Sequence, residues 1–361
     1  MLLPEPRINL LPPAVHGGLN YREIEGFGLA AGDILDFSAS INPYGPPPGI
    51  KGVLGEAEIG AYPDSDAGEL KKALAEKLGT SPANLIIGSG STELIRLVAT
   101  AYFGPGDSVL IPQPAYGDYE VAATLAGARV LREPLAVAQN GFRFDAGRLV
   151  GAIRRWRPKG IFVGNPNNPT GAYLAREEVV EIIGASPDTL VVLDEAYLGF
   201  TENAWSSLDL VGRGNLLVVR SMTKDYALAG LRLGYGVASE AIIGALEKVK
   251  SPWSVSAPAQ KTGLFVLGQA EYPAACARRL RRASRYLRRN LSRLGFEALP
   301  SSTNFFLVRV GDAAGFRAKL LKKGILVRDA ASFGLAEYIR IAPRRLGECR
   351  RLVAAIREII A

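Results

Sequence analysis

The 361-residue chain has only two cysteines, Cys276 and Cys349, and a single histidine, His16. Two widely spaced cysteines exclude a disulfide scaffold and a cysteine-based zinc site, so we expect no metal in this protein. A membrane-spanning helix needs roughly 20 consecutive apolar residues, and no segment approaches that length. Prolines interrupt the opening MLLPEPRINLLPP, where a signal peptide would need an unbroken apolar run. We therefore expect a cytoplasmic protein without a membrane partner.

One long stretch, residues 276–294, lacks acidic side chains altogether. It contains eight arginines, a number equal to the net charge of +8 of the whole chain. Leucines recur at helical spacing in the same stretch, which predicts an amphipathic helix whose arginines form a solvated face. A nucleic-acid-binding surface is the alternative for such a helix. No binding motif accompanies the arginines, and we expect no nucleic-acid partner.

Short β-branched apolar runs alternate with helical segments from about residue 50, and they lie at residues 85–89, 108–112, 160–164, 190–194 and 215–219. This alternation predicts an α/β fold with a mostly parallel sheet covered by helices on both faces. The alternation of strands and helices ends after Pro252. A long basic helix, a few short strands and a closing amphipathic helix follow, and they predict a smaller α+β domain. We expect an N-terminal segment (1–48) that joins the small domain, a large domain (49–250) and a C-terminal small domain (251–361).

Polar residues follow four of the five apolar runs. Gly-Ser-Gly-Ser-Thr begins at residue 88, NPNNPTG covers 165–171, DEAY covers 194–197 and SMTK covers 221–224. Open parallel sheets bind ligands beyond the carboxyl ends of their strands. We therefore expect these four segments to meet at one site.

Two of the segments have residues that could bind a phosphate group, and one of them also has a lysine that could react with a carbonyl group. Gly90, Ser91 and Thr92 open a helix, and free N–H groups at a helix start favour a phosphate. A plain N-cap is the alternative interpretation. In SMTKDYALAGLR, Ser221 and Thr223 precede Lys224, a lysine that could trap a carbonyl group, and Arg232 follows it. A surface lysine in a loop is the alternative for Lys224.

The other two segments reduce the weight of those alternatives. NPNNPTG is a proline-locked turn that presents Asn168, and LDEAY puts Asp194 at the end of a buried strand with Tyr197 three residues later. A buried aspartate needs a cationic partner, and a protonated pyridine nitrogen is such a partner. A magnesium ligand is the competing interpretation of Asp194, but no P-loop lysine motif accompanies it.

Together these motifs make the chain resemble the fold-type I pyridoxal-phosphate enzymes of the aminotransferase class I/II family. The resemblance implies pyridoxal 5'-phosphate as cofactor, a seven-stranded sheet in the large domain, and a homodimer with its sites at the subunit interface. It also implies that Lys224 carries the cofactor as a Schiff base and moves the proton at the substrate α-carbon. Asp194 would pair with the pyridine nitrogen, Tyr197 and Asn168 would bond the ring hydroxyl, and Tyr116 would stack on the ring.

The same resemblance implies the residues that bind phosphate and substrate. Arg340, in YIRIAPR, would clamp the substrate α-carboxylate, and Arg328, in ILVRD, would contact the substrate phosphate. Tyr62 would reach the cofactor phosphate from the second subunit. The remaining ligands of that phosphate would be Gly90, Ser91, Thr92, Ser221, Thr223 and Arg232.

Two branches of the family match best, and both act on phosphorylated substrates: histidinol-phosphate aminotransferase and threonine-phosphate decarboxylase. HGG at 16–18, followed by ILDFSASINPYGPPPG at 34–49, is similar to the decarboxylase pattern. His16 and Asn20 would then contact substrate, although Leu19 stands where the decarboxylases commonly have asparagine. We expect decarboxylation of threonine phosphate to aminopropanol phosphate for cobalamin biosynthesis, with histidinol-phosphate transamination as the alternative. A nucleic-acid-binding protein on the same scaffold is a distant third.

Overall fold

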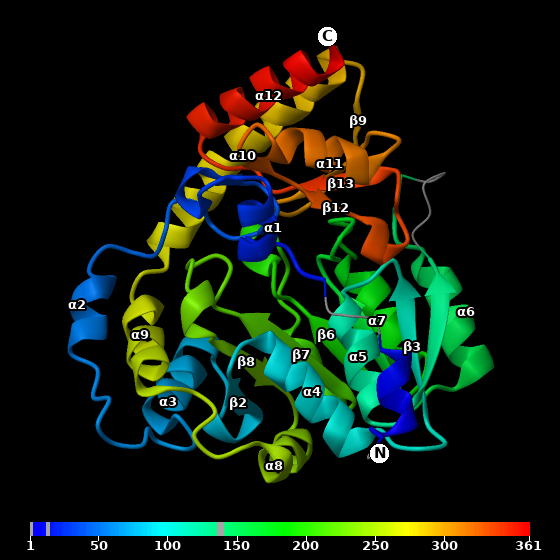
Figure 1. The fold of residues 1–361 in the computed structure, drawn as a ribbon. Coiled ribbons are helices and arrows are strands. Elements are labelled where there is room, and N and C mark those ends of the chain that lie inside the picture. The colour runs from blue at the N-terminus through cyan, green and yellow to red at the C-terminus, as the bar shows by residue number, and fades with distance from the viewer. Residues whose placement is uncertain (1–2, 12–14, 136–140) are drawn as a thin grey trace.

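The computed structural model describes residues 3–11, 15–135 and 141–361, which form a large and a small body (Figure 1). A seven-stranded sheet in the order β2-β8-β7-β6-β5-β3-β4 runs through the large body. Only β8 is antiparallel to its neighbours, so the mostly parallel α/β sheet predicted from the sequence is confirmed. The strands are β2 (Leu85–Gly88), β3 (Ser108–Gln113), β4 (Arg129–Pro134), β5 (Gly160–Gly164), β6 (Leu190–Asp194), β7 (Leu216–Ser221) and β8 (Gly234–Val237).

Helices cover both faces of this sheet because its strands carry apolar residues on both sides. On β6, Val191 and Leu193 pack in one apolar core, and Leu190 and Val192 pack in the other. The first face is covered by α3 (Gly68–Leu78), α6 (Ala146–Trp156), α7 (Arg176–Gly184) and α9 (Ala257–Leu267). The second is covered by α4 (Ser91–Tyr102), α5 (Gly117–Leu125) and α8 (Glu240–Val249).

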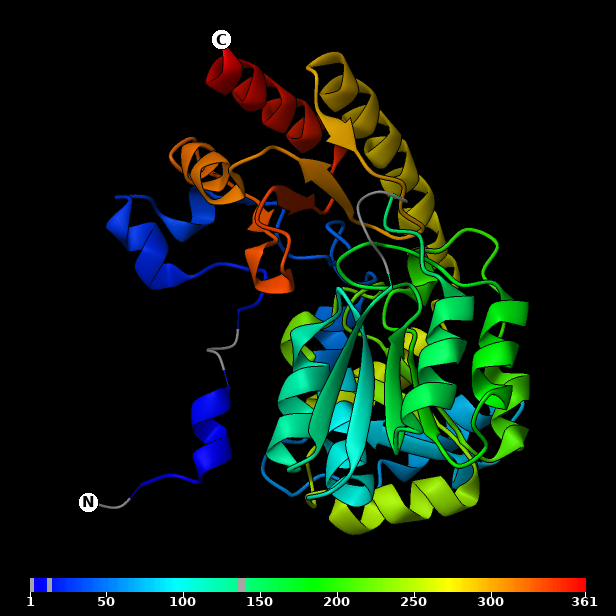
Figure 2. The ribbon, with the colours of Figure 1, turned by 90° about the vertical axis from the view of Figure 1, so that its right-hand side faces the viewer.

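The small body contains a four-stranded sheet in the order β12-β13-β10-β9. Its strands are β9 (Glu297–Ala298), β10 (Phe306–Arg309), β12 (Arg328–Asp329) and β13 (Tyr338–Ile341). Its helices are α10 (Glu271–Arg293), α11 (Ala313–Leu321) and α12 (Leu346–Ile360), and α10 and α12 lie side by side (Figure 2).

The N-terminal part of the chain contacts both bodies, because the short 3-10 helix Pro6–Leu10 lies against α5 of the large body and residues 21–36 contact the small body. β1 (Leu35–Asp36) pairs in parallel with β11 (Ile325–Leu326), and α1 (Tyr21–Gly26) packs nearby through Ile24. The short α2 (Ile50–Gly55) then leads into the large body beside α9. The three domain boundaries expected from the sequence stay a prediction. No helix in the described ranges is long and apolar enough to cross a membrane.

A buried ion pair joins β7 to the residue that follows β6, and it supports a stability prediction. Arg220 Nε donates to Glu195 Oε2 at 2.8 Å, and the Glu195 side chain is 1 % exposed. Burial raises the pKa of Glu195, and the Arg220 guanidinium opposes that shift. Replacing Arg220 with glutamine leaves this carboxylate buried and unpaired, so we expect the variant to lose about 3–5 kcal/mol of unfolding free energy.

Chemical denaturation of the apoprotein measures that loss. The matched control is Arg176→Gln, which breaks an exposed pair with Asp209 and should cost about 1 kcal/mol or less. Equal losses in the two variants would contradict a special role for the buried pair.

Candidate active site

The start of α4 forms an anion-binding corner with the loop after β7. Gly90 precedes the helix with a φ of 79°, and a Cβ there would lie 2.6 Å from an Arg232 guanidinium nitrogen. Ser221 ends β7 opposite Gly234, whose own Cβ would lie 2.8 Å from the Ser91 backbone nitrogen. The corner therefore joins helix N–H groups, side-chain hydroxyls and a guanidinium, which together suit a phosphate.

Its hydroxyl groups are arranged in two pairs. Ser221 Oγ and Thr223 Oγ1 are 2.7 Å apart, and Thr92 Oγ1 lies 3.3 Å from the Tyr116 hydroxyl. The O–H groups in each pair can rotate and donate to a bound oxyanion. The structure thus brings the predicted phosphate ligands of this subunit into one corner.

Asp194 ends β6 as a fully buried carboxylate. The Tyr119 hydroxyl donates to Oδ2 at 2.8 Å, and the Ala196 backbone N–H donates to Oδ1 at 2.9 Å. Burial raises the pKa of Asp194, and the Tyr119 hydroxyl, the Ala196 amide and the Lys224 ammonium each oppose this shift. No ion pair reaches Asp194 within the described part of the chain. A cationic ring nitrogen would supply the missing partner.

Lys224 follows β7 and is held by the INP run of the N-terminal segment. The Asn42 backbone N–H donates to the Lys224 carbonyl at 2.9 Å, and the Asn42 amide donates to the Asp225 carbonyl at 2.9 Å. Lys224 Nζ lies 5.7 Å from the centroid of the Tyr197 ring. The lysine, Tyr197 and Asp194 therefore lie around one space at the sheet edge.

Two arginines of the small body lie beside the NPNNPTG turn. Arg340 Nη1 donates to Asn168 Oδ1 at 2.5 Å, and Arg340 Nη2 donates to the Ser38 carbonyl at 2.9 Å. Arg328 lies directly opposite Arg340 across the β12–β13 pair. Burial lowers the pKa of both arginines, and the Asp329 carboxylate, 4.0 Å from Arg328 Nη1, opposes part of the shift at Arg328.

His16 faces the same region from the N-terminal segment. Its Nε2 lies 3.9 Å from the buried carboxylate of Asp118, and its ring centroid is 6.3 Å from that of Tyr116. Tyr116 stands edge-on to Tyr119, and Tyr119 stacks on Phe162 of β5. The two tyrosines and His16 form an aromatic wall beside Asp194.

Two predicted residues lie elsewhere in this chain. Asn20 is exposed and caps α1, where its side-chain oxygen accepts from the Glu23 N–H at 3.3 Å. Tyr62 is 79 % exposed and stacks on Trp253 with ring centroids 4.3 Å apart. The exposed pair of Tyr62 and Trp253 leaves room for a contact with a second subunit, and that contact stays a prediction.

Sequence reasoning missed Tyr119 and the anchoring role of Asn42. Tyr119 belongs to the QPAYGDY run, three residues after the tyrosine that was selected, and only the fold shows that it reaches Asp194. Asn42 lies in the ILDFSASINPYGPPPG run, which the sequence connects with the decarboxylase pattern and not with Lys224. Its spacing of 182 residues from Lys224 hides the contact.

A phosphate corner, a buried carboxylate without an ion pair and a lysine lie together at one sheet edge, and these are the groups that a pyridoxal-phosphate site requires. These residues fit the cofactor. Gly90 leaves space where a Cβ would clash with the Arg232 guanidinium, and the buried Asp194 carboxylate can pair with a protonated pyridine nitrogen. No cluster of metal-ligating side chains occurs in residues 3–11, 15–135 or 141–361.

Residues 32–356 match the family model "Aminotransferase class I and II", and the chain belongs to this family of pyridoxal-phosphate enzymes. It is 35% identical over 340 residues to histidinol-phosphate aminotransferase 1 of Thiobacillus denitrificans, covering 92% of this chain and 87% of that protein. It is 34% identical to histidinol-phosphate aminotransferase 2 of Ralstonia nicotianae, covering 98% and 96%.

Solved structures agree with this assignment. The Sinorhizobium meliloti histidinol-phosphate aminotransferase in complex with pyridoxal-5'-phosphate matches with a TM-score of 0.88 at 27% identity, covering 98% of this chain and 96% of that one. The L-threonine-O-3-phosphate decarboxylase of Porphyromonas gingivalis matches with a TM-score of 0.81 at 30% identity, covering 90% and 98%. The predicted family, fold and cofactor are confirmed.

Removing the Tyr119 hydroxyl tests how Asp194 is kept ionised. In Tyr119→Phe the carboxylate loses one of two donors, and we expect kcat to fall about 10- to 100-fold, as for a lost bond to a charged group. The pKa of Asp194 should rise further, so the acid limb of the pH–activity profile should move to higher pH. Tyr102→Phe is the control, because Tyr102 packs on the same apolar core without a bond to Asp194. An unmoved acid limb would contradict this role.

Proposed function

We propose that this enzyme acts at the α-carbon of a phosphorylated amino compound, with histidinol-phosphate transamination as its first candidate reaction. The relatives named above support transamination. The preference for threonine-phosphate decarboxylation drawn from the sequence is not confirmed, and the alternative fits these relatives better.

The proposal of a phosphorylated substrate rests on one observation, the buried pair of Arg328 and Arg340. Each residue is 5 % exposed, and both guanidinium groups lie near the Phe333 ring. Arg328 Nη2 donates to the Val15 carbonyl at 3.0 Å and to Ser332 Oγ at 2.6 Å, and its Nη1 lies 4.0 Å from the Asp329 carboxylate. The hydrogen-bond acceptors of Arg340 are uncharged. Arg340 Nε has no hydrogen-bond partner in the described structure.

Two buried like charges on facing strands repel each other and are costly to desolvate. Asp329, 4.0 Å from Arg328, offsets only part of this charge. A phosphate between the two guanidinium groups compensates the remaining charge, and its three oxygens accept more N–H bonds at once than the two oxygens of a carboxylate. The arginine pair thus favours a substrate with a phosphate group.

The chemistry divides among the residues of the site as follows. Bound pyridoxal phosphate withdraws electrons from a bond at the substrate α-carbon. Lys224 holds the cofactor covalently and then moves the proton at that carbon. Asp194 keeps the ring nitrogen protonated, Asn168 and Tyr197 bond the ring hydroxyl, and Arg340 orients the substrate through its anionic group. We further propose a homodimer in which Tyr62 meets the partner's cofactor phosphate.

Threonine-phosphate decarboxylation is the second candidate, and the HGG run favours it. A Cβ on Gly17 would lie 2.4 Å from the Ser38 carbonyl oxygen, which is the oxygen that Arg340 Nη2 contacts. The Gly18 N–H donates to Ser38 Oγ at 2.8 Å. HGG and DFS, on which the decarboxylase resemblance rests, therefore meet beside the substrate arginine.

One assay on the holoenzyme separates the candidates. With histidinol phosphate and 2-oxoglutarate we expect glutamate to form at every turnover, and with threonine phosphate we expect no carbon dioxide. Carbon dioxide released from threonine phosphate without a keto acid would replace the first candidate with the second. Turnover of only unphosphorylated amino acids would contradict both.

A further inference from the structure

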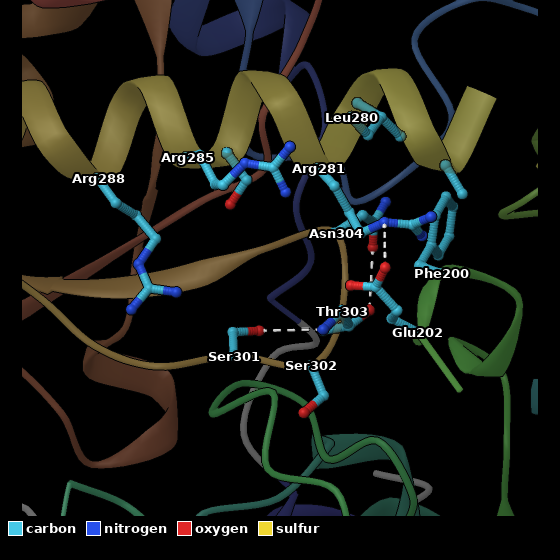
Figure 3. A pocket seen from close by; sticks show the side chains of 12 residues that line it. Phe200, Glu202, Leu280, Arg281, Arg285, Arg288, Ser301, Ser302, Thr303 and Asn304 are labelled. Carbon is cyan, nitrogen blue, oxygen red and sulfur yellow. Dashed lines mark hydrogen bonds and ion pairs between the residues drawn. The ribbon is translucent and has the colours of Figure 1, made fainter. Parts of the chain in front are cut away.

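The arginine-rich helix α10 borders a cavity that the reaction does not use. The cavity has a volume of about 280 Å³ and lies between α10 and the segment 301–304 (Figure 3). Arg281, Arg285 and Arg288 line it from the helix, and none of the residues assigned above to cofactor or substrate lines it.

The positive charge at this cavity is largely uncompensated. Arg281 Nε lies 3.7 Å from Glu202, which is the only acidic residue among the cavity-lining residues. Arg285 and Arg288 have no ion pair among the residues that the structure describes. Burial lowers the pKa of Arg288, so this arginine is partly removed from water without a counterion. An anion is the missing partner.

A second observation points to a ligand independently of the arginines. Asn304 lines the cavity and is 4 % exposed, yet its Nδ2 has no hydrogen-bond partner within the described ranges. Thr303 Oγ1 is within 3.3 Å of the Asn304 Oδ1, which leaves the amide N–H groups free to donate. An unpaired buried donor is unfavourable unless an acceptor reaches it.

The two ends of the cavity differ in character. Arg285 and Arg288 supply donors toward one end, and Phe200 and Leu280 lie at the other end, beside the pair of Arg281 and Glu202 (Figure 3). Several donors match the oxygens of a phosphate group, and the apolar end accepts a small organic body. We propose that this cavity binds a small phosphate monoester with an apolar body at a site separate from the active site.

The cavity wall is continuous with the active site. The Ser302 N–H donates to the Gly171 carbonyl at 2.9 Å, in the turn that carries Asn168. Phe305, next to Asn304, stands edge-on to the Tyr197 ring at 4.9 Å and lies 5.1 Å from the Arg340 guanidinium. Segment 301–304 therefore connects the cavity to the turn whose Asn168 contacts Arg340.

Phenyl phosphate is a suitable probe, titrated calorimetrically into the holoenzyme. We expect two sites per chain, because the arginines at 328 and 340 also bind the probe. Arg285→Gln/Arg288→Gln should weaken one site about tenfold or more, and Arg328→Gln/Arg340→Gln should weaken the other. Benzoate, which has the ring and one charge, should bind the cavity at least about tenfold more weakly.

The matched control is Arg278→Gln/Arg289→Gln, which removes two exposed charges from α10 outside the cavity. This variant should keep both sites. An equal loss in both α10 double variants would show diffuse attraction to the helix and overturn the proposal. A single site unaffected by Arg285→Gln/Arg288→Gln would also overturn it, as would equal binding of benzoate. Turnover of the α10 variants is expected to stay normal, so this result is independent of the proposed reaction.

Discussion

Replacing Lys224 with alanine is expected to lower turnover by about 10⁴-fold or more, because the variant loses both the attachment of the cofactor and the group that moves the proton. The phosphate corner at Gly90 and Arg232 is untouched, so the variant should still bind pyridoxal phosphate noncovalently. Turnover and the absorption spectrum of the bound cofactor measure the two effects separately.

Lys250→Ala is the matched control for that experiment. Lys250 is partly buried in the large body, and burial lowers its pKa, which makes it the lysine most similar to a reactive amine outside the site. Its loss should leave turnover and spectrum unchanged. A Lys224→Ala enzyme within tenfold of the native rate would contradict the assignment.

Replacing Arg340 with lysine should raise KM for the phosphorylated substrate about 100- to 1,000-fold. Lysine keeps the charge but loses the planar pair of donors that now contacts Asn168 and the Ser38 carbonyl. Cofactor affinity should change far less than KM, since Arg340 contacts none of the residues in the phosphate corner and touches the cofactor site only through Asn168. Initial rates across substrate concentration, with cofactor titration of the apoprotein, measure both quantities.

Arg309→Lys controls for the general effect of this substitution in the small sheet. Arg309 lies on β10, is exposed and pairs with Glu337 at 3.2 Å. Its KM should match that of the native enzyme. A KM for Arg340→Lys equal to that of the control would mean that the buried arginine does not bind substrate.

The sequence predicts the strands of the large sheet well where a strand is buried on both faces, because such a strand consists of consecutive apolar residues. β5 (Gly160–Gly164) and β6 (Leu190–Asp194) coincide with the predicted runs at both ends. β4 and β8 were missed for different reasons. β4 is an edge strand with charged residues in RVLREP, and β8 is Gly-Tyr-Gly-Val, whose glycines give no strand signal.

The site was predictable where its residues follow strands, because strand ends in a parallel sheet converge at one edge. Asp194, Lys224 and Gly90 meet there in the structure. Tyr119 and Asn42 could not be inferred, since their roles depend on contacts between distant segments that leave no local pattern. Asn20 differs from these residues, because a local hydrogen bond from the Glu23 N–H explains the position of its side chain without any ligand.

Borohydride reduction of the holoenzyme, followed by peptide mass spectrometry, tests the central claim most directly. We predict that the reduced cofactor is found on the peptide containing Lys224, in one equivalent per chain. Modification at Lys250 or any other lysine, or an unmodified chain after saturation with pyridoxal phosphate, would contradict the account.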